Sequence, residues 1–290
     1  MKTKLSQLKE KGYCVFDQAL EKKVLEKIKR VSRQALEELT IEHRKNNKSQ
    51  GSLIQVADYP DFGMLIGNEK LKEIFRKLGF DDTRFSSGYI ISKPNNSPAL
   101  FWHQDWWGWD HPLSYTVQIA QVFVMIYLQD TNPQNGCLRV IPRSHRSYHA
   151  LHSNQKAHTE SASRVEDPND SIYNSLSEEV PVPVKCGDVI VGDARLIHGS
   201  FPNQSEDERT LITLWYHPHY NMLPGAMQSR ICEIFNRKGV DTDPDGEESM
   251  TLLKWPERFR QPIEALFPSC PEDAEPYPWC RIPSWSQSIK

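Results

Sequence analysis

The sequence has no long hydrophobic run and no strong excess of either charge. No stretch approaches the roughly 20 apolar residues that cross a membrane, and the charged segment Met1 to Gln7 contains no apolar core of signal-peptide length. Lys and Arg total 35 against 38 Asp and Glu, giving a formal net charge of -3. Nucleic-acid binding depends on a basic surface. We therefore expect no nucleic-acid partner, no membrane span and a cytoplasmic location.

The six cysteines form no recognisable metal or redox motif. No two of them are separated by only two residues, which argues against zinc-ribbon and thioredoxin-type pairs. A chain of 290 residues with 38% hydrophobic residues can build its core without disulfides. We therefore expect free thiols, and the alternative is a Cys270–Cys280 pair in the C-terminal segment.

The first part of the chain is predicted to be mostly helical. Apolar residues between Leu20 and Leu39 recur in steps of three and four, which places them on one face of a helix. Shorter helices are expected from Leu5 to Gly12 and from Leu71 to Gly79, because glycine commonly ends a helix. Tyr13 to Phe16 is predicted to be a strand, and residues 43–52 are predicted to be a loop.

From Phe85 onward the pattern changes to short strands. These segments are rich in β-branched and aromatic residues and are bounded by Gly, Pro, Asn or Asp. They are Tyr89 to Ile91, Val117 to Leu128, Cys137 to Ile141, Val180 to Val184, Val189 to Val191 and Thr210 to Tyr216. Many short strands without alternating helices predict a mainly β fold with two packed sheets or a closed barrel.

We expect one domain over residues 1–290, with a helical layer (1–84), a β core (85–220) and a C-terminal extension (221–290) that wraps the surface. Residues 144–179 are polar and interrupt the core, so we interpret them as an insertion that closes over the substrate. This insertion contains the histidines His145, His149, His152 and His158. Without cysteines or a clear carboxylate partner they are expected to be exposed side chains rather than a second metal site.

Three residues form a candidate metal site. His103 and Asp105 are two positions apart, and on a strand such residues point to the same face. His198, which follows a predicted strand and precedes Gly199, is the best candidate for a second imidazole. Two histidines and one carboxylate leave coordination positions open and suit non-haem Fe(II). A His-x-Asp pair alone often occurs by chance, so the prediction depends on the conjunction.

Arg209 adds a second element to this site. It lies eleven residues after His198, and Pro202, Asn203 and Gln204 favour a hairpin loop that returns Arg209 close to the histidine. A guanidinium binds a carboxylate through two parallel hydrogen bonds. A metal with open positions and a carboxylate clamp together suit a 2-oxo acid. The alternative is that Arg209 is an ordinary surface cation.

Six motifs, in this order along the chain, point to a known family. They are Gly12-Tyr13-Cys14-Val15, His103-Gln104-Asp105, the stretch from Asn135-Gly136-Cys137-Leu138 to Pro142-Arg143-Ser144-His145, Gly187-Asp188, His198-Gly199-Ser200, and Arg209. Together they resemble the phytanoyl-CoA dioxygenase family over Gly12 to about Tyr216, which is most of the chain. The long central stretch and the spacing between His198 and Arg209 carry most of this resemblance.

The resemblance implies a double-stranded β-helix (jelly-roll, cupin-like) core that binds Fe(II) and uses 2-oxoglutarate and dioxygen, with ascorbate helpful in vitro. By motif position, the metal ligands are His103, Asp105 and His198. The expected contacts to 2-oxoglutarate come from Arg209, Ser200, Tyr89, Gln121 and Gln118. In halogenating relatives Gly or Ala replaces the carboxylate ligand, so Asp105 argues for oxygen chemistry. No catalytic residue beyond the metal ligands is expected.

The substrate pocket is predicted beside the metal motif. Trp102, Trp106 and Trp107 surround this motif, and together with Met125 they are expected to line the pocket. Packing in the core is an equally good interpretation of each tryptophan. We expect hydroxylation of an unactivated C–H bond in a small apolar or amphipathic metabolite, with release of succinate and CO2, by a monomer or homodimer.

Other outcomes stay open at this point. The same cofactors support desaturation, epoxidation or ring formation. Arg139, Arg143, His145 and Arg146 offer a basic surface for an acyl-CoA substrate. An alternative of another class is a non-catalytic, cupin-like metal-binding module.

Overall fold

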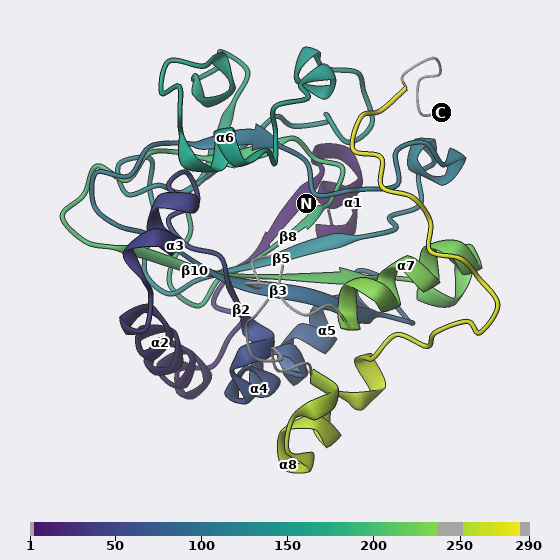
Figure 1. Ribbon diagram of the computed structural model, residues 1–290. Helices are drawn as coiled ribbons and strands as arrows, with labels where there is room; N and C mark the ends of the chain where they lie inside the picture. Colours follow the sequence, from purple (N-terminus) through teal and green to yellow (C-terminus); the bar gives the residue numbers. More distant parts are fainter. Residues whose placement is uncertain (1–2, 237–251, 285–290) are drawn as a thin grey trace.

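The computed structural model describes residues 3–236 and 252–284 (Figure 1). Two antiparallel sheets lie face to face, one of six strands in the order β1-β8-β5-β10-β3-β2 and one of four in the order β4-β9-β6-β7. The short strands predicted two packed sheets or a closed barrel, and the family resemblance implied a jelly roll. The two-sheet jelly roll confirms both expectations. Among the described residues no helix is long and apolar enough to cross a membrane.

The strands agree with the sequence in position more closely than in length. The larger sheet contains β1 (Tyr13–Phe16), β2 (Ile54–Gln55), β3 (Arg84–Lys93), β5 (Val122–Tyr127), β8 (Val189–Asp193) and β10 (Arg209–His217). The smaller sheet contains β4 (Leu100–His103), β6 (Leu138–Val140), β7 (Val180–Val182) and β9 (His198–Ser200). β5 begins at Val122 rather than Val117. The backbone just before it bonds elsewhere, because Ala120 O lies 3.0 Å from His217 Nδ1 and Gln121 O accepts from Ala194 N at 3.0 Å.

The helices surround the sheets. They are α1 (Lys4–Lys11), α2 (Lys22–Glu37), α3 (Ile41–Asn46), α4 (Gly63–Ile66), α5 (Glu69–Lys77), α6 (Glu160–Arg164), α7 (Gly225–Asn236) and α8 (Glu257–Arg260). α1 ends at Gly12, whose φ of 90° is easy for glycine only. The loop predicted for residues 43–52 is wrong in its first part, because Thr40 accepts a hydrogen bond from His43 N and caps α3.

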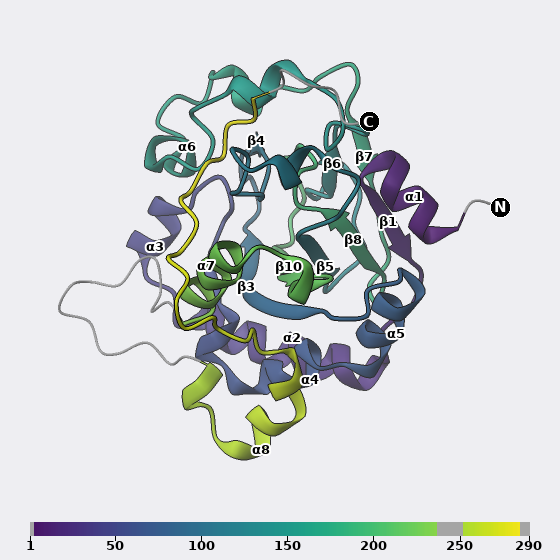
Figure 2. The same cartoon turned by 90° about the vertical axis from the view of Figure 1, so that its right-hand side faces the viewer.

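The larger sheet has two different faces. Helices α2, α4 and α5 cover its outer face (Figures 1 and 2). Ile212 and Leu214 of β10 point to that side and join the core beneath the helices. Leu211 points the other way and packs with Met125 and Tyr127 in a core between the two sheets. The alternation of the strand therefore sends half of β10 into a helix-covered core and half into the jelly roll.

The connection between β9 and β10 is not a hairpin loop, so that prediction is wrong. β9 belongs to the smaller sheet and β10 to the larger one, and residues 201–208 cross between them. The amide of Asn203 holds this crossing, since its Nδ2 donates to the carbonyl oxygens of Lys93, Pro94 and Asp207 at 3.0, 3.1 and 2.8 Å. The short distance in sequence suggested a hairpin, but the chain passes from the smaller sheet to the larger one between these two strands.

The insertion 144–179 contains α6 and the 3-10 turns Ala150–Ser153 and Ser171–Tyr173. Arg139 ties it to the smaller sheet. Its Nη2 donates to Tyr173 O at 3.0 Å and to Leu100 O at 3.1 Å, and its Nη1 pairs with Glu179 at 3.2 Å. Arg139 and His145 are both 1% exposed. Neither of them contributes to the basic surface considered for an acyl-CoA.

The C-terminal extension lies along α7. A disulfide joins Cys232 of α7 to Cys270, with a Cα–Cα distance of 5.7 Å. Both cysteine expectations are therefore wrong for this pair: two of the thiols are not free, and Cys270 is joined to Cys232 rather than to Cys280. Cys280 keeps a free thiol. The reason is tertiary, because Tyr220 holds the extension beside α7 by donating to Ser269 O at 2.8 Å.

Candidate metal and cosubstrate site

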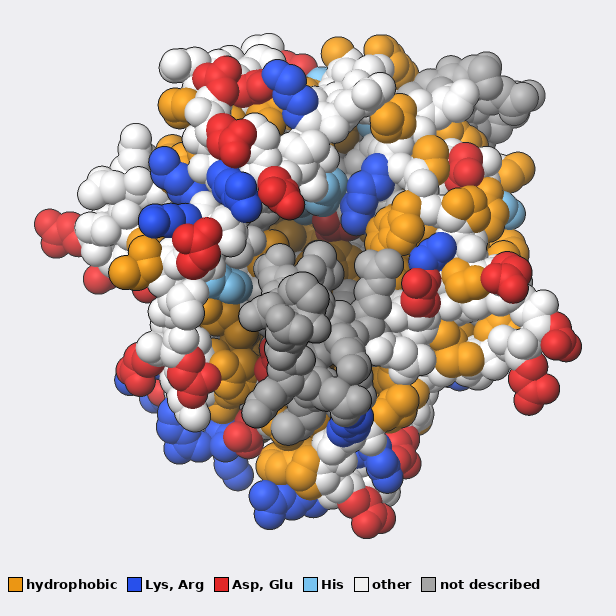
Figure 3. All heavy atoms as spheres, in the orientation of Figure 1, with side chains coloured by type: hydrophobic (Ala, Val, Ile, Leu, Met, Phe, Trp, Pro, Cys, Tyr) orange, Lys and Arg blue, Asp and Glu red, His pale blue; other side chains and the backbone are white. Residues whose placement is uncertain are grey.

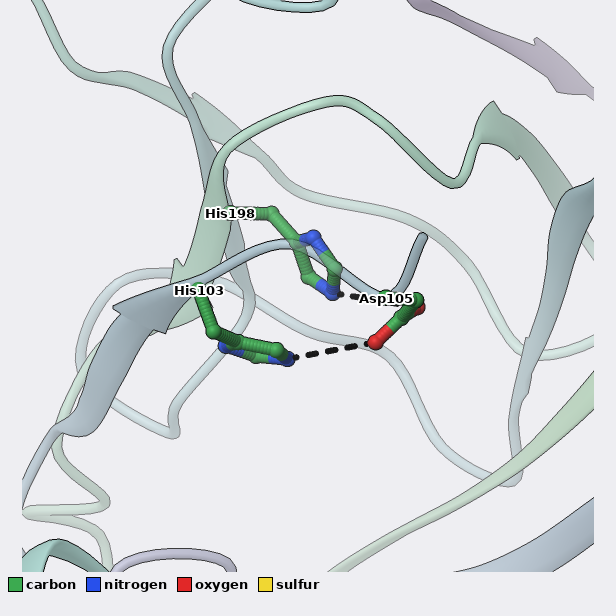
Figure 4. Close-up of side chains that lie close together, drawn as sticks. All are labelled: His103, Asp105 and His198. Carbon is green, nitrogen blue, oxygen red and sulfur yellow. Dashed lines mark ion pairs between the residues drawn. The ribbon is translucent and has the colours of Figure 1, made fainter. Parts of the chain in front are cut away.

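His103, Asp105 and His198 converge from the ends of β4 and β9 (Figure 4). One ligand atom of each lies within 4.8 Å of the others. Asp105 Oδ1 lies 3.6 Å from His103 Nε2, and Asp105 Oδ2 lies 3.8 Å from His198 Nε2. The two strands pair at His103 and His198, which brings the imidazole rings to a centroid separation of 4.2 Å. The structure therefore brings together the three residues that the sequence singled out.

Backbone carbonyls orient both imidazoles. His103 Nδ1 lies 3.0 Å from Phe101 O, and His198 Nδ1 lies 3.0 Å from Leu196 O. A carbonyl oxygen only accepts, so each Nδ1 carries the proton and each Nε2 lone pair faces Asp105. Burial lowers the pKa of His103 to about 3, with a smaller effect in the same direction from His198. Neutral imidazoles with free Nε2 atoms are the form that binds a metal.

Asp105 reaches the site by a route that the sequence did not suggest. β4 ends at His103, so strand alternation does not place the carboxylate. The backbone turns instead, and the N–H groups of Asp105 and Trp106 both donate to Ala194 O at 2.9 Å. Trp215 Nε1 then donates to Asp105 Oδ2 at 2.9 Å. Trp215 is a functional residue that sequence reasoning missed, because no local signal links it to a residue 110 positions away.

Close packing behind His198 fixes its ring. The ring of Phe123 lies 4.7 Å from the His198 ring, centroid to centroid. Phe123 in turn lies directly over Gly192 of β8, where an added Cβ would come within 2.0 Å of the phenyl ring. Gly192 therefore has to be glycine for Phe123 to support the histidine. Rigid support of this kind keeps ligands in place when the metal is absent.

Arg209 is the second centre of the site. It is 1% exposed, and burial lowers its pKa. Its Nε and Nη1 have no hydrogen-bond partner among the described residues, and neither have the buried hydroxyls of Ser200 and Thr213. Its Cζ lies 5.4 Å from the ring of Tyr127, on the inner side of the larger sheet. Buried polar atoms without partners are costly, so this group of atoms marks a ligand site.

Lys93 lies opposite Arg209 in the β3–β10 ladder and is fully buried as well. Its Nζ donates to Ser49 O and to Pro98 O, so its hydrogen bonds are made within the protein. Lys93 therefore has hydrogen-bond partners within the protein, whereas Arg209 Nε and Nη1 have none among the described residues. Thr213, which lies on the same face of β10, is a second residue that sequence reasoning missed.

The other predicted cosubstrate residues lie in varied positions. Tyr89 of β3 faces the interior beside Trp215, with ring centroids 5.8 Å apart. Gln118 and Gln121 precede β5 and do not belong to it, contrary to expectation. Buried side-chain atoms of both, Gln118 Nε2 and Gln121 Oε1, lack hydrogen-bond partners among the described residues. Gln121 O accepts from Ala194 N at 3.0 Å, so its backbone supports the turn that holds Asp105.

The tryptophans near the metal motif are core residues. Trp102, Trp106 and Trp107 are each 1% exposed. Trp102 packs with Ile141 and Ile197, while Trp106 and Trp107 pack in a cluster under α7. All three therefore pack in the core, and their part in lining a substrate pocket stays a prediction. Met125, 7% exposed, faces the interior between the sheets.

The histidines of the insertion also depart from expectation. His145 is 1% exposed and His152 is 2% exposed, so these two are not surface residues. His158 is exposed, yet its ring lies 5.1 Å from that of His103. The insertion therefore reaches the edge of the metal site, as a segment closing over the substrate would.

The donor set fits iron and 2-oxoglutarate. Two neutral imidazoles and a carboxylate on one side of a metal leave positions for the 2-oxo acid group. The far carboxylate of such an acid would supply the missing partners of Arg209, Ser200 and Thr213. A structural zinc site, by contrast, normally has four protein ligands, and here three converge.

Comparison with known proteins agrees with this geometry. The model of the family "Phytanoyl-CoA dioxygenase (PhyH)" matches residues 8–211. A probable alpha-ketoglutarate-dependent hypophosphite dioxygenase of Stutzerimonas stutzeri is 25% identical over 207 residues, covering 67% of this chain and 69% of the relative. Phytanoyl-CoA dioxygenase 1 of Oryza sativa subsp. japonica is 30% identical over 131 residues, covering 44% and 42%. An ectoine dioxygenase of Stutzerimonas stutzeri (strain A1501) is 27% identical over 204 residues, covering 63% and 66%.

Solved structures share the fold at low identity. SnoN, an alpha-ketoglutarate-dependent epimerase from nogalamycin biosynthesis, aligns with a TM-score of 0.54 at 14% identity over 85% of this chain and 92% of its own. HygX from Streptomyces hygroscopicus, with nickel and 2-oxoglutarate bound, aligns with a TM-score of 0.53 at 18% identity over 74% and 86%. The family match, the jelly roll and the convergent triad have one explanation: the chain belongs to the phytanoyl-CoA dioxygenase family of Fe(II)- and 2-oxoglutarate-dependent oxygenases.

Proposed function

We propose that this chain is a dioxygenase that hydroxylates an unactivated C–H bond of a small amphipathic metabolite and converts 2-oxoglutarate to succinate and CO2. The observation that carries the proposal is the buried Arg209 guanidinium, whose Nε and Nη1 have no partner among the described residues. It lies on the inner side of the same jelly roll as the His103–Asp105–His198 cluster. A non-catalytic metal module has no use for such an arginine, whose burial without an anion is costly.

The residues have separate parts in this reaction. His103, Asp105 and His198 would hold iron, and Trp215 keeps Asp105 Oδ2 in one orientation. Arg209, with Ser200 and Thr213, would bind the far carboxylate of 2-oxoglutarate and so fix the position of its 2-oxo acid group. Tyr89, Gln118 and Gln121 are proposed as further contacts on the basis of sequence position. When bound, iron and 2-oxoglutarate would supply the oxidation: one oxygen atom of dioxygen would enter the substrate and the other would enter succinate, with release of CO2.

A small substrate is favoured over an acyl-CoA. Arg139 and His145 are buried, so they cannot contribute to the basic surface that a CoA group would require. Two of the similar curated proteins are named for small molecules, hypophosphite and ectoine. The inner wall accessible to a substrate is formed by partly buried apolar residues of β3 and β10, Tyr89, Ile91 and Trp215.

The proposal is tested by measuring conversion of 2-oxoglutarate to succinate in the absence of the substrate to be hydroxylated. Protein purified under argon and supplied with Fe(II), ascorbate and 2-oxoglutarate should form succinate slowly and show the visible charge-transfer band of an iron–2-oxo acid complex. H103A should lose both signals. H149A is the matched control, because His149 lies in the insertion and pairs with Glu178. Bound zinc, no band and no succinate would instead support the non-catalytic metal module.

A further inference from the structure

The C-terminal strap, defined here as residues 270–284, reaches the metal site from outside the segment that matches the family model, 8–211. Cys280 N donates to Trp107 O at 2.7 Å, and Trp109 N donates to Cys280 O at 3.0 Å. The side-chain amide of Gln104 donates to Arg281 O at 2.9 Å. Figure 2 shows the strap passing α7 and continuing towards β4. These bonds fix Arg281 beside the backbone of the His103-Gln104-Asp105 motif.

The side chain of Arg281 turns towards the triad. Its Nη1 donates to Asp105 O at 3.1 Å and to Gln104 O at 3.3 Å, and lies 3.3 Å from His158 Nε2. Its Cζ lies 5.0 Å from the Trp279 ring. Within residues 3–236 and 252–284, no hydrogen-bond partner is found for Nε or Nη2, and no side-chain carboxylate lies within ion-pair distance. Arg281 therefore presents a charged edge with two open donors.

Arg281 lies beside residues of the metal site and of the inner wall. Burial lowers its pKa, while the nearby Asp105 and Tyr89 act in the opposite direction. Tyr89 contacts Trp215, whose indole binds Asp105, and all three belong to the inner wall or the metal site. His158 closes the other side with its ring against His103. Figure 3 shows one face of the molecule with a hollow near its centre and histidine, cationic and acidic side chains beside it.

We propose that Arg281 binds a carboxylate of the substrate, which makes the substrate an amphipathic monocarboxylic acid with its apolar part against Tyr89, Ile91 and Trp215. This inference rests on the proposed function. Nε and one terminal nitrogen form the parallel fork that matches a carboxylate. A phosphate monoester carries nearly two negative charges. With the Asp105 carboxylate close by and one guanidinium present, a single negative charge is the better match.

The test uses straight-chain acids as probes: hexanoate, octanoate and decanoate, each compared with the primary amide of the same length. Each is titrated anaerobically into the protein loaded with Fe(II) and 2-oxoglutarate, and perturbation of the charge-transfer band gives its Kd. In the wild type the acids should bind at least about tenfold more tightly than the amides, as expected for a charge-assisted pair. R281Q should abolish this preference, and R281K should retain part of it.

R230Q is the matched control. Arg230 also lies against Trp279, with its Cζ 5.9 Å from the ring, and it bonds to Tyr277 O of the strap. Its loss loosens the strap without removing the charge beside Asp105, so R230Q should keep the preference for acids. Equal binding of acids and amides, a wild-type band that no acid perturbs, or an unchanged preference in R281Q would overturn the inference. So would an equal loss in R230Q. Absence of the band before any probe is added is a different result, which refutes the proposed function itself.

Discussion

The two faces of β10 differ: the outer face is closely packed, whereas the inner face buries polar atoms that have no hydrogen-bond partner among the described residues. On the outer face, Ile212, Leu214 and Tyr216 pack against the helical layer, and Tyr216 OH donates to Ile66 O at 3.0 Å. On the inner face, Arg209 and Thr213 bury polar atoms that have no partner among the described residues. The outer face of this strand thus stabilises the fold, whereas the unpaired polar atoms on its inner face cost stability until a ligand binds them. Such incomplete satisfaction is typical of a binding site.

The largest effect is expected where the inner side holds the metal. H103A should reduce succinate formation by more than about 100-fold, since losing even an outer-shell partner costs about 10–100-fold. Unfolding should stay cooperative, because His103 is not part of the helix-covered core. Iron content after anaerobic purification and succinate formation are the measurements. An H103A protein with full iron content would contradict the assignment.

Replacing Arg209 should weaken the binding of 2-oxoglutarate without lowering the stability of the cosubstrate-free protein. R209M should raise the KM for 2-oxoglutarate by about 30-fold or more, as expected for removal of one partner of a buried charge pair. Without 2-oxoglutarate, the variant should be as stable as the wild type or more stable, because an unpaired buried charge has been removed. The two quantities are read from steady-state kinetics and thermal unfolding. Marked destabilisation of the cosubstrate-free protein would show that Arg209 has a partner within the fold.

The opposite result is expected on the outer face of the same strand. L214A should lower the free energy of unfolding by about 2–5 kcal/mol, because it leaves a cavity in a closely packed core. The KM for 2-oxoglutarate in the folded fraction should not change. Denaturant unfolding and kinetics at low temperature make the comparison. A larger effect on the KM than on stability would mean that the two faces are not separate.

Trp215 links β10 to the metal. W215F keeps an aromatic ring and removes the indole N–H that donates to Asp105 Oδ2. Iron affinity should fall by about 10-fold, the lower end of the effect of losing such an outer partner. Competition with an iron chelator measures this directly. Unchanged affinity would indicate that the backbone turn at Ala194 suffices to orient Asp105.

The smallest effect is expected at Thr213. T213V keeps the shape of the side chain and removes a buried hydroxyl without a partner among the described residues. The cosubstrate-free protein should gain up to about 1 kcal/mol of stability, while 2-oxoglutarate should bind more weakly by a similar free energy. Thermal unfolding with and without 2-oxoglutarate tests both signs. An increase of stability by 2-oxoglutarate equal to that of the wild type would remove Thr213 from the site.

Much of the fold was predictable because it depends on local patterns. The three-and-four spacing from Leu20 to Leu39 gave α2 (Lys22–Glu37), and the short β-branched segments gave most strands of the two sheets. What failed depended on partners distant in the sequence. Within the strand predicted from Val117, Ala120 O bonds to the His217 side chain instead of a neighbouring strand, and Cys270 pairs with Cys232 because the strap lies along α7.

The site shows the same division. The metal ligands and Arg209 could be found from residue type and spacing, since iron and a 2-oxo acid need imidazole, carboxylate and guanidinium groups. The tryptophans show the limit of residue type, because an aromatic residue beside a metal ligand packs in the core as readily as it lines a pocket. Trp215 and Arg281 carried no signal, because each acquires its part only by contacting Asp105, which is far away in the sequence. Thr213 carried none, because the local sequence does not show that its hydroxyl is buried without a partner among the described residues.

The sequence by itself determined the chemistry available here, which is two histidines, one aspartate and one arginine in a fixed order. It also determined the strand alternation that separates the two faces of β10. The tertiary structure decided how these groups meet. It ended β4 at His103 and turned Asp105 onto Trp215, and it routed residues 201–208 between the sheets. It also placed Arg281 of the strap over the site. Local propensity reaches only a few residues, whereas these contacts depend on which surfaces pack together once the whole chain has folded.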